Sequence, residues 1–187
     1  MSLKKLVARI EAENEIFDSL SKAEKRVRIA QDCLERIKLN LISPYTNNFL
    51  YPASISVLQM NSNLKESVNS NIQCSACAKG GLFLSYVGRV NNFDSCKLVG
   101  GNDVDDSEHK KLLEIFTLRQ LALIEFAFEG NQYLNRYWDK SGENSIEIKF
   151  SEKLQINAYN FCRRYDVKER LIAICENIIE NKGTFKL

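Results

Sequence analysis

Residues 74–89 read CSACAKGGLFLSYVGR, and this stretch predicts the central packing helix of the fold. At about 100° per residue, its small side chains fall in one narrow stripe, and large apolar side chains occupy the rest of the circumference. The stripe consists of Cys74, Cys77, Ala78, Gly81, Ser85 and Gly88. A flat face lets another backbone approach more closely than the usual interaxial distance of about 8–10 Å. We therefore expect this helix to be buried against a second one.

The expected neighbour is a helix over 107–128, which is apolar nearly all round. A helix of this kind is buried on most sides. Asp105 and Glu108 have the spacing of a capping box at its start, and Gly130 with Asn131 ends it. We expect this helix to lie against the small face of the 74–89 helix.

Four more helices are indicated by apolar residues at helical spacing, over 3–20, 21–41, 151–165 and 166–183. Ser21 with Glu24 and Asp166 with Glu169 have the spacing of capping boxes at two of the starts. The sequence therefore predicts a mainly α, single-domain bundle of about six helices, spanning residues 1–187.

Two or three short accessory strands are expected to join this bundle. Alternating or β-branched runs suggest them at 53–60, 95–99 and 145–150. The segment 43–72 is rich in Asn and Ser, contains Pro44 and Pro52, and has few charges. We expect it to form a long, partly ordered loop within the domain.

The composition excludes several classes of protein. The 187 residues carry a formal net charge of +2, so no bulk attraction to nucleic acid or to an anionic membrane is expected. The longest apolar run, Leu121 to Ala127, contains Glu125 and is too short to cross a bilayer. Acidic residues early in the chain argue against a secretion signal. We expect a soluble, cytoplasmic protein whose six cysteines are reduced.

The Cys74-x-x-Cys77 spacing has three interpretations. A zinc site would need two more ligands, for which Cys96 and His109 are available at irregular spacing. A redox pair would gain from the helix dipole, but such pairs normally follow a strand in a βαβ unit. The third interpretation, which we favour, is that both thiols are small packing residues, because the small stripe continues beyond them.

The stretch before the 107–128 helix holds further candidate chemistry. His109 is the sole histidine and hence the available general base, although a charged helix start is typical of exposed surface. Oxygen ligands for Mg²⁺ or Ca²⁺ could come from Asp103, Asp105, Asp106 and Glu108. Acidic residues ahead of a helix are, however, what the helix dipole already favours.

Arg119 is the candidate on which a ligand hypothesis depends. On the wheel of the 107–128 helix it points the same way as Leu112 and Leu123, with Gln120 at the flank of that apolar face. A charge in such a place must be paired or must face a polar cavity. One hypothesis is a structural salt bridge, for example with Glu125. The other is an anion clamp, because a guanidinium binds phosphate or carboxylate bidentately.

Aromatic residues that follow this helix could complete such a site. Tyr133, Tyr137 and Trp138 could stack on a purine ring, with Arg136 among them, although closing the core is their more usual role. The predicted ligand-binding residues are Arg119, Gln120, Tyr133 and Trp138. We expect any such site to lie between Arg119 and the 43–72 loop.

The helix that begins after Ser21 also carries a cluster of basic residues, namely Lys25, Arg26, Arg28, Arg36 and Lys38. A phosphate-binding surface is one interpretation. Because Glu24, Asp32 and Glu35 are interleaved with the cluster, we favour a solvated helix face.

Three strings carry a resemblance to a family: CSACAKGGLFLS at 74–85, LALIEFAFEG at 121–130 and RLIAICENIIENKGTF at 170–185. They resemble an uncharacterised family of small, mainly helical proteins of bacteria and phages. In that family a Cys-x-x-Cys-Ala-x-Gly helix is followed by a closing Asn-Ile-Ile-x-Asn-x-Gly turn. Because no activity is known for the family, the resemblance implies only a prokaryotic or phage cytoplasmic setting.

The leading functional hypothesis is a non-enzymatic binding or regulatory protein that needs no cofactor. Its partner would be a small anionic molecule that it sequesters or a host protein that it inhibits, and neither membrane nor nucleic acid is expected. The alternative is a small enzyme or zinc protein that uses Cys74, Cys77, Cys96 and His109. A homodimer built on exposed apolar helix surface is a third hypothesis.

Overall fold

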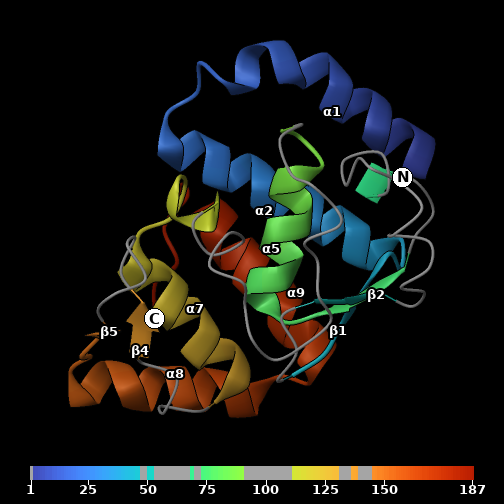
Figure 1. The fold of residues 1–187 in the computed structure, drawn as a ribbon. Coiled ribbons are helices and arrows are strands. Elements are labelled where there is room, and N and C mark those ends of the chain that lie inside the picture. Colours follow the sequence, from blue (N-terminus) through green and yellow to red (C-terminus); the bar gives the residue numbers. More distant parts are fainter. Residues whose placement is uncertain are drawn as a thin grey trace.

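The computed structural model shows a mainly α fold (Figure 1). It describes residues 2–46, 50–52, 68–69, 73–90, 111–130, 136–138 and 145–187. Six helices of ten or more residues lie in these ranges: α1 (Leu3–Phe17), α2 (Lys22–Lys38), α5 (Ala78–Val87), α7 (Leu118–Glu129), α8 (Glu152–Arg164) and α9 (Val167–Glu180). The predicted fold class, a mainly α bundle with short accessory strands, is confirmed.

Two small sheets accompany the helices. The first contains β1 (Ile42–Pro44), β2 (Leu50–Pro52) and β3 (Cys74–Ala76), with β3 in the middle, parallel to β1 and antiparallel to β2. The second pairs β4 (Arg136–Trp138) with β5 (Ser145–Glu147). The strand predicted over 145–150 is therefore present but shorter. The strands predicted at 53–60 and 95–99 lie outside the described residues, as does most of the 43–72 loop.

The stretch from Cys74 to Arg89 is a strand followed by a helix, so the prediction of one continuous helix is wrong. The backbone of β3 pairs with both β1 and β2, which holds residues 74–76 extended. Cys77 is the extended N-cap, and α5 begins at Ala78. Every residue of α5 is buried, as a central packing helix requires.

At Gly81 and Gly88 the small face of α5 lies against α2, whereas the 107–128 segment was the predicted neighbour. A Cβ atom added at Gly81 would lie 3.2 Å from Sγ of Cys33, and one at Gly88 would lie 2.7 Å from Nη2 of Arg36. Both neighbours belong to α2. The idea that thin residues permit a close approach of two segments is therefore correct for Gly81 and Gly88, although the partner helix is different.

The predicted 107–128 helix is interrupted. Residues 111–113 are helical, 114–116 form a turn, and α7 begins only at Leu118; residues 107–110 lie outside the described part of the chain. Thr117 is the N-cap, and its hydroxyl accepts a hydrogen bond from the backbone N–H of Gln120 at 3.2 Å. In the turn before α7, the carbonyl of Ile115 accepts a hydrogen bond from Nη1 of Arg26 at 2.7 Å, and this contact connects the turn to α2.

The core lies among α2, α5, α7 and α9. Ile29, Leu82, Leu121 and Ile174, one from each of these helices, have no exposed surface. In Figure 1, α9 runs alongside α2 behind α5, α8 packs on α7, and α1 lies beside α2 at the edge of the molecule. None of the helices in the described ranges combines the length and apolarity that a membrane span needs.

Candidate functional site

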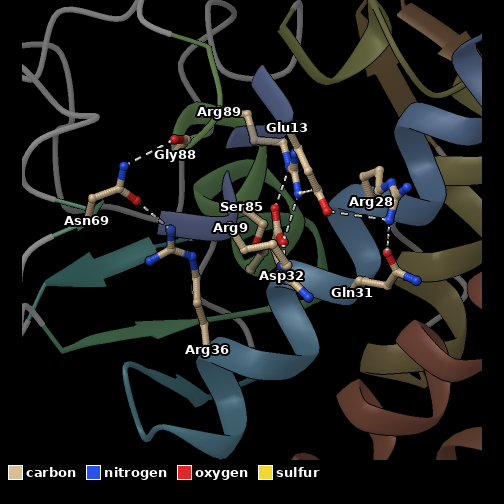
Figure 2. A network of polar contacts seen from close by, with 11 residues as sticks. Arg9, Glu13, Arg28, Gln31, Asp32, Arg36, Asn69, Ser85, Gly88 and Arg89 are labelled. Carbon is tan, nitrogen blue, oxygen red and sulfur yellow. Dashed lines mark hydrogen bonds and ion pairs between the residues drawn. The ribbon is translucent and has the colours of Figure 1, made fainter. Parts of the chain in front are cut away.

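Asp32, in the middle of α2, accepts hydrogen bonds from two arginines (Figure 2). Arg89 donates from Nε to Oδ2 at 2.5 Å and from Nη2 to Oδ1 at 3.0 Å, and Arg9 of α1 donates from Nη2 to Oδ1 at 2.7 Å. The Asp32 side chain has no exposed surface and that of Arg89 is 1% exposed. Burial raises the pKa of Asp32, and the charges of Arg89 and Arg9 oppose that rise. These contacts join α1, α2 and the end of α5.

Glu13 adds a second carboxylate, one helical turn after Arg9 on α1. Its Oε2 lies 3.0 Å from Nη2 of Arg89, and its Oε1 lies 3.7 Å from Nη1 of Arg28 on α2. The guanidinium of Arg89 also stacks over the ring of Phe17, 5.1 Å from its centroid. Arg89 therefore has one fully buried and one partly exposed carboxylate partner.

Arg36 is a buried cation whose hydrogen-bond partners are neutral. It donates from Nη1 to the carbonyl of Val68 at 2.5 Å and from Nη2 to Oδ1 of Asn69 at 2.7 Å. Asn69 in turn donates to the carbonyl of Gly88 at 3.2 Å. Burial lowers the pKa of Arg36, and the nearby charge of Asp32 partly offsets this effect.

We call these residues the arginine network: Arg9, Arg36 and Arg89 with their acceptors Glu13, Asp32 and Asn69. Three guanidiniums face two carboxylates, which leaves one positive charge in excess. Within the described part of the chain, three buried N–H groups also lack an acceptor, at Nε of Arg9, Nε of Arg36 and Nη1 of Arg89. A buried donor without a partner costs about 1–3 kcal/mol, so the network has unused capacity for an anionic acceptor.

The favoured interpretation of the basic cluster on α2, a solvated helix face, is wrong for Arg36 and for the interleaved Asp32. Arg36 is 1% exposed and Asp32 is fully buried, whereas a solvated face was predicted. Lys38 is exposed as predicted, and Arg28 lies at the partly exposed edge of the network. A phosphate-binding role for part of this cluster, the other interpretation, stays a prediction.

Arg119 is exposed, so the expectation that it lies within an apolar face is wrong. Its helix begins at Leu118, and Arg119 therefore occupies the first turn of α7 and not the middle of a long helix. It donates from Nη1 to the carbonyl of Lys149 at 3.1 Å and stacks over Phe150, 5.0 Å from the ring centroid. Glu125, its suggested partner, pairs with Lys79 at 2.6 Å.

The other predicted ligand-binding residues lie only partly within the described structure. Gln120 is half-buried beside Arg119, and its Oε1 lacks a hydrogen-bond partner. Trp138 lies on β4, where its backbone is in register with Ser145, and Tyr133 lies outside the described residues. A ligand-binding role for these residues stays a prediction.

Cys74 and Cys77 are both buried, on β3 and at the N-cap of α5. Burial raises the pKa of the Cys74 thiol to about 11 and that of the Cys77 thiol to about 12, so the thiolate needed for redox or metal chemistry is disfavoured. No group of three or more metal-binding side chains occurs in the described ranges. The predicted zinc site stays a prediction, because Cys96 and His109 lie outside them.

These two thiols should make the protein less stable in alkali. Below their ordinary pKa near 9, the thiols are protonated in the folded and unfolded chain alike, so their contribution is fully present. Above that ordinary pKa, the two thiols ionise in the unfolded chain but stay protonated in the folded chain, until the pH reaches their raised pKa values. From pH 8 to pH 10 the free energy of unfolding should fall by about 1.4 kcal/mol per thiol, measured by urea unfolding with reductant. In Cys77→Ala the fall in the free energy of unfolding from pH 8 to pH 10 should be smaller by about 1.4 kcal/mol, the contribution of one thiol. An unchanged fall would contradict the raised pKa of the Cys77 thiol.

The fold and the site define a mainly α protein with a guanidinium–carboxylate network between three of its helices. Comparison with protein-family models, with curated proteins and with solved structures finds no match for this chain. The resemblance to a bacterial and phage family stays a prediction. The geometry of the arginine network is therefore the basis for a proposed function.

Proposed function

We propose that this protein is a non-enzymatic binding protein for a small oxyanion, which it holds at the arginine network. The observation that carries the proposal is the set of three buried N–H groups, on Arg9, Arg36 and Arg89, that have no acceptor among the residues the structure describes. A carboxylate or phosphate oxygen accepts such donors in the geometry that a guanidinium offers. The function is the one expected from the sequence, but its site moves from Arg119 to the network.

The partly exposed side of the network indicates where a ligand would enter. The side chains of Arg9, Glu13 and Arg28 are 32%, 21% and 39% exposed, whereas Asp32 and Arg89 are enclosed. A ligand that reaches Arg89 would therefore pass between α1 and α2. The enclosure of Asp32 and Arg89 supports a small molecule, or one charged group of a larger one, as the ligand. A cytoplasmic setting is a proposal that rests on the acidic residues early in the chain and on the expected reduced cysteines. A bacterial or phage setting and the inhibition of a host protein are proposals that rest on the sequence resemblance alone.

A thermal-shift titration tests this function. The protein is titrated with sodium phosphate, sulfate or acetate, and each series is compared with sodium chloride at equal ionic strength. An oxyanion that binds the folded state should raise the melting temperature along a saturable curve, since a ligand at 100 times its Kd stabilises by about 2.7 kcal/mol. Arg9→Lys keeps the charge but removes a planar donor, and it should weaken binding about tenfold.

Arg163→Lys, at an exposed arginine of α8, is the matched control and should bind like the wild type. Far-UV circular dichroism should show that both variants fold. A melting temperature that follows ionic strength alone, or equal losses in the two variants, would overturn the proposed function.

A further inference from the structure

Glu13 differs from the other carboxylate of the arginine network in the way it is held. Asp32 accepts three hydrogen bonds from Arg9 and Arg89 and is fully buried. Glu13 has one hydrogen bond at 3.0 Å and one looser ion pair at 3.7 Å, and its side chain is 21% exposed. Figure 2 shows it between Arg89 and Arg28. Partly exposed ion pairs of this kind are weak and are readily exchanged for other partners.

Arg89 does not depend on Glu13 for its position. Two hydrogen bonds to Asp32 and the ring of Phe17 would still hold its guanidinium if the Glu13 side chain swung away. The Glu13 carboxylate lies between the guanidiniums of Arg89 and Arg28, which belong to two different segments. An external oxyanion could occupy the same place and bind the same two guanidiniums. We propose that Glu13 is a displaceable internal carboxylate, and that a phosphate monoester of a small molecule binds Arg89 and Arg28 by replacing it.

Charge decides between a phosphate monoester and a simple carboxylate. When Arg28, which pairs with Glu13, is counted with the network, four guanidiniums share two carboxylates among the described residues, an excess of two positive charges. Once Glu13 has left, Asp32 is the remaining carboxylate and the excess is three. A phosphate monoester brings a charge of about −1.5 to −2 at neutral pH and three acceptor oxygens, whereas a carboxylate brings −1 and two oxygens. The dianion therefore neutralises more of the excess.

Isothermal titration calorimetry tests this inference, which rests on the proposed function. Three proteins, the wild type, Glu13→Gln and Glu15→Gln, are each titrated with phenyl phosphate and with benzoate. Glu15 lies on the same helix and is exposed, so Glu15→Gln makes the same change in net charge away from the network. Glu13→Gln should bind phenyl phosphate at least about fivefold more tightly than the wild type, because the competing charge is gone. Glu15→Gln should match the wild type, and benzoate should bind more weakly than phenyl phosphate to all three.

The outcomes separate the two proposals. Absence of binding to both ligands in all three proteins would overturn the proposed function and this inference with it. Wild-type binding that Glu13→Gln does not tighten, or that Glu15→Gln tightens equally, would overturn the displacement of Glu13 alone. A Glu13→Gln variant that fails to fold would overturn it too, because a displaceable carboxylate cannot be essential to the fold. Benzoate binding as tight as phenyl phosphate would overturn the choice of ligand class.

Discussion

Replacing Asp32 with leucine is expected to lower the free energy of unfolding by about 3–5 kcal/mol. The substitution removes the buried acceptor that Arg9 and Arg89 share, and it leaves the Arg89 side chain, 1% exposed, with the partly exposed Glu13 as its remaining carboxylate. The cost is mainly that of a buried cation that loses its buried counter-charge. Urea unfolding followed by circular dichroism measures it.

Two further variants show whether this cost comes from the unpaired charge. Asp32→Leu combined with Arg89→Met removes both charges, and it should be less destabilised than the sum of the two single variants. Asp18→Ala, at an exposed aspartate, should change stability by no more than about 0.5 kcal/mol. If the effects of Asp32→Leu and Arg89→Met simply add, the two side chains are not coupled as the structure shows.

Local signals explain why the helices could be predicted from the sequence. Ser21 and Glu24 form the complete predicted capping box, and the side chains of Ser151 and Asp166 cap α8 and α9. These contacts lie within three residues of each other along the chain. The strand β3 had no such signal, because its three residues are held extended by β1 and β2, more than twenty residues earlier in the sequence.

The buried charges of α2 illustrate what a helix wheel can and cannot reveal. In the 21–41 helix, Ala30, Leu34 and Ile37 recur at helical spacing and mark one apolar face, and Arg36 lies outside the face that these three residues define. Ile29 is also fully buried, and on the wheel it lies about 20° from Arg36. This extra apolar position was the signal that the buried arc is wide enough to include Arg36. Its actual partners, Val68 and Asn69, could not be found from local sequence.

Arg119 was misplaced for the opposite reason. Its predicted orientation came from a wheel drawn continuously from 107 to 128, but the chain turns at 114–116 before Thr117 caps a new helix. Any angular relation between Leu112 and Arg119 is lost at that turn. Thr117 followed by a run of good helix formers was the available signal for a second start.

Gly183→Ala should lower the free energy of unfolding by about 3–5 kcal/mol. Gly183 has φ of +88°, a backbone conformation that alanine adopts only with strain. A Cβ atom there would lie 2.2 Å from the carbonyl oxygen of Ala23 and 2.8 Å from its carbonyl carbon, and these backbone atoms belong to α2. Alanine would therefore push the end of α9 away from α2 and stretch the 2.5 Å hydrogen bond from Arg26 to the Gly183 carbonyl.

Gly130→Ala is the matched control, because it shares the positive φ but not the collision with backbone. Gly130 has φ of +70°, and its added Cβ would meet the Sγ atom of Cys162 at 2.6 Å, a side-chain atom that can rotate away. We expect this variant to lose about 1–2 kcal/mol, the cost of the backbone conformation with a small adjustment. Equal losses in the two variants, compared by urea unfolding, would mean that the contact of Gly183 with α2 is looser than the structure shows. A larger loss in Gly183→Ala would show that the close approach of α9 to α2 requires a residue without a side chain at this position.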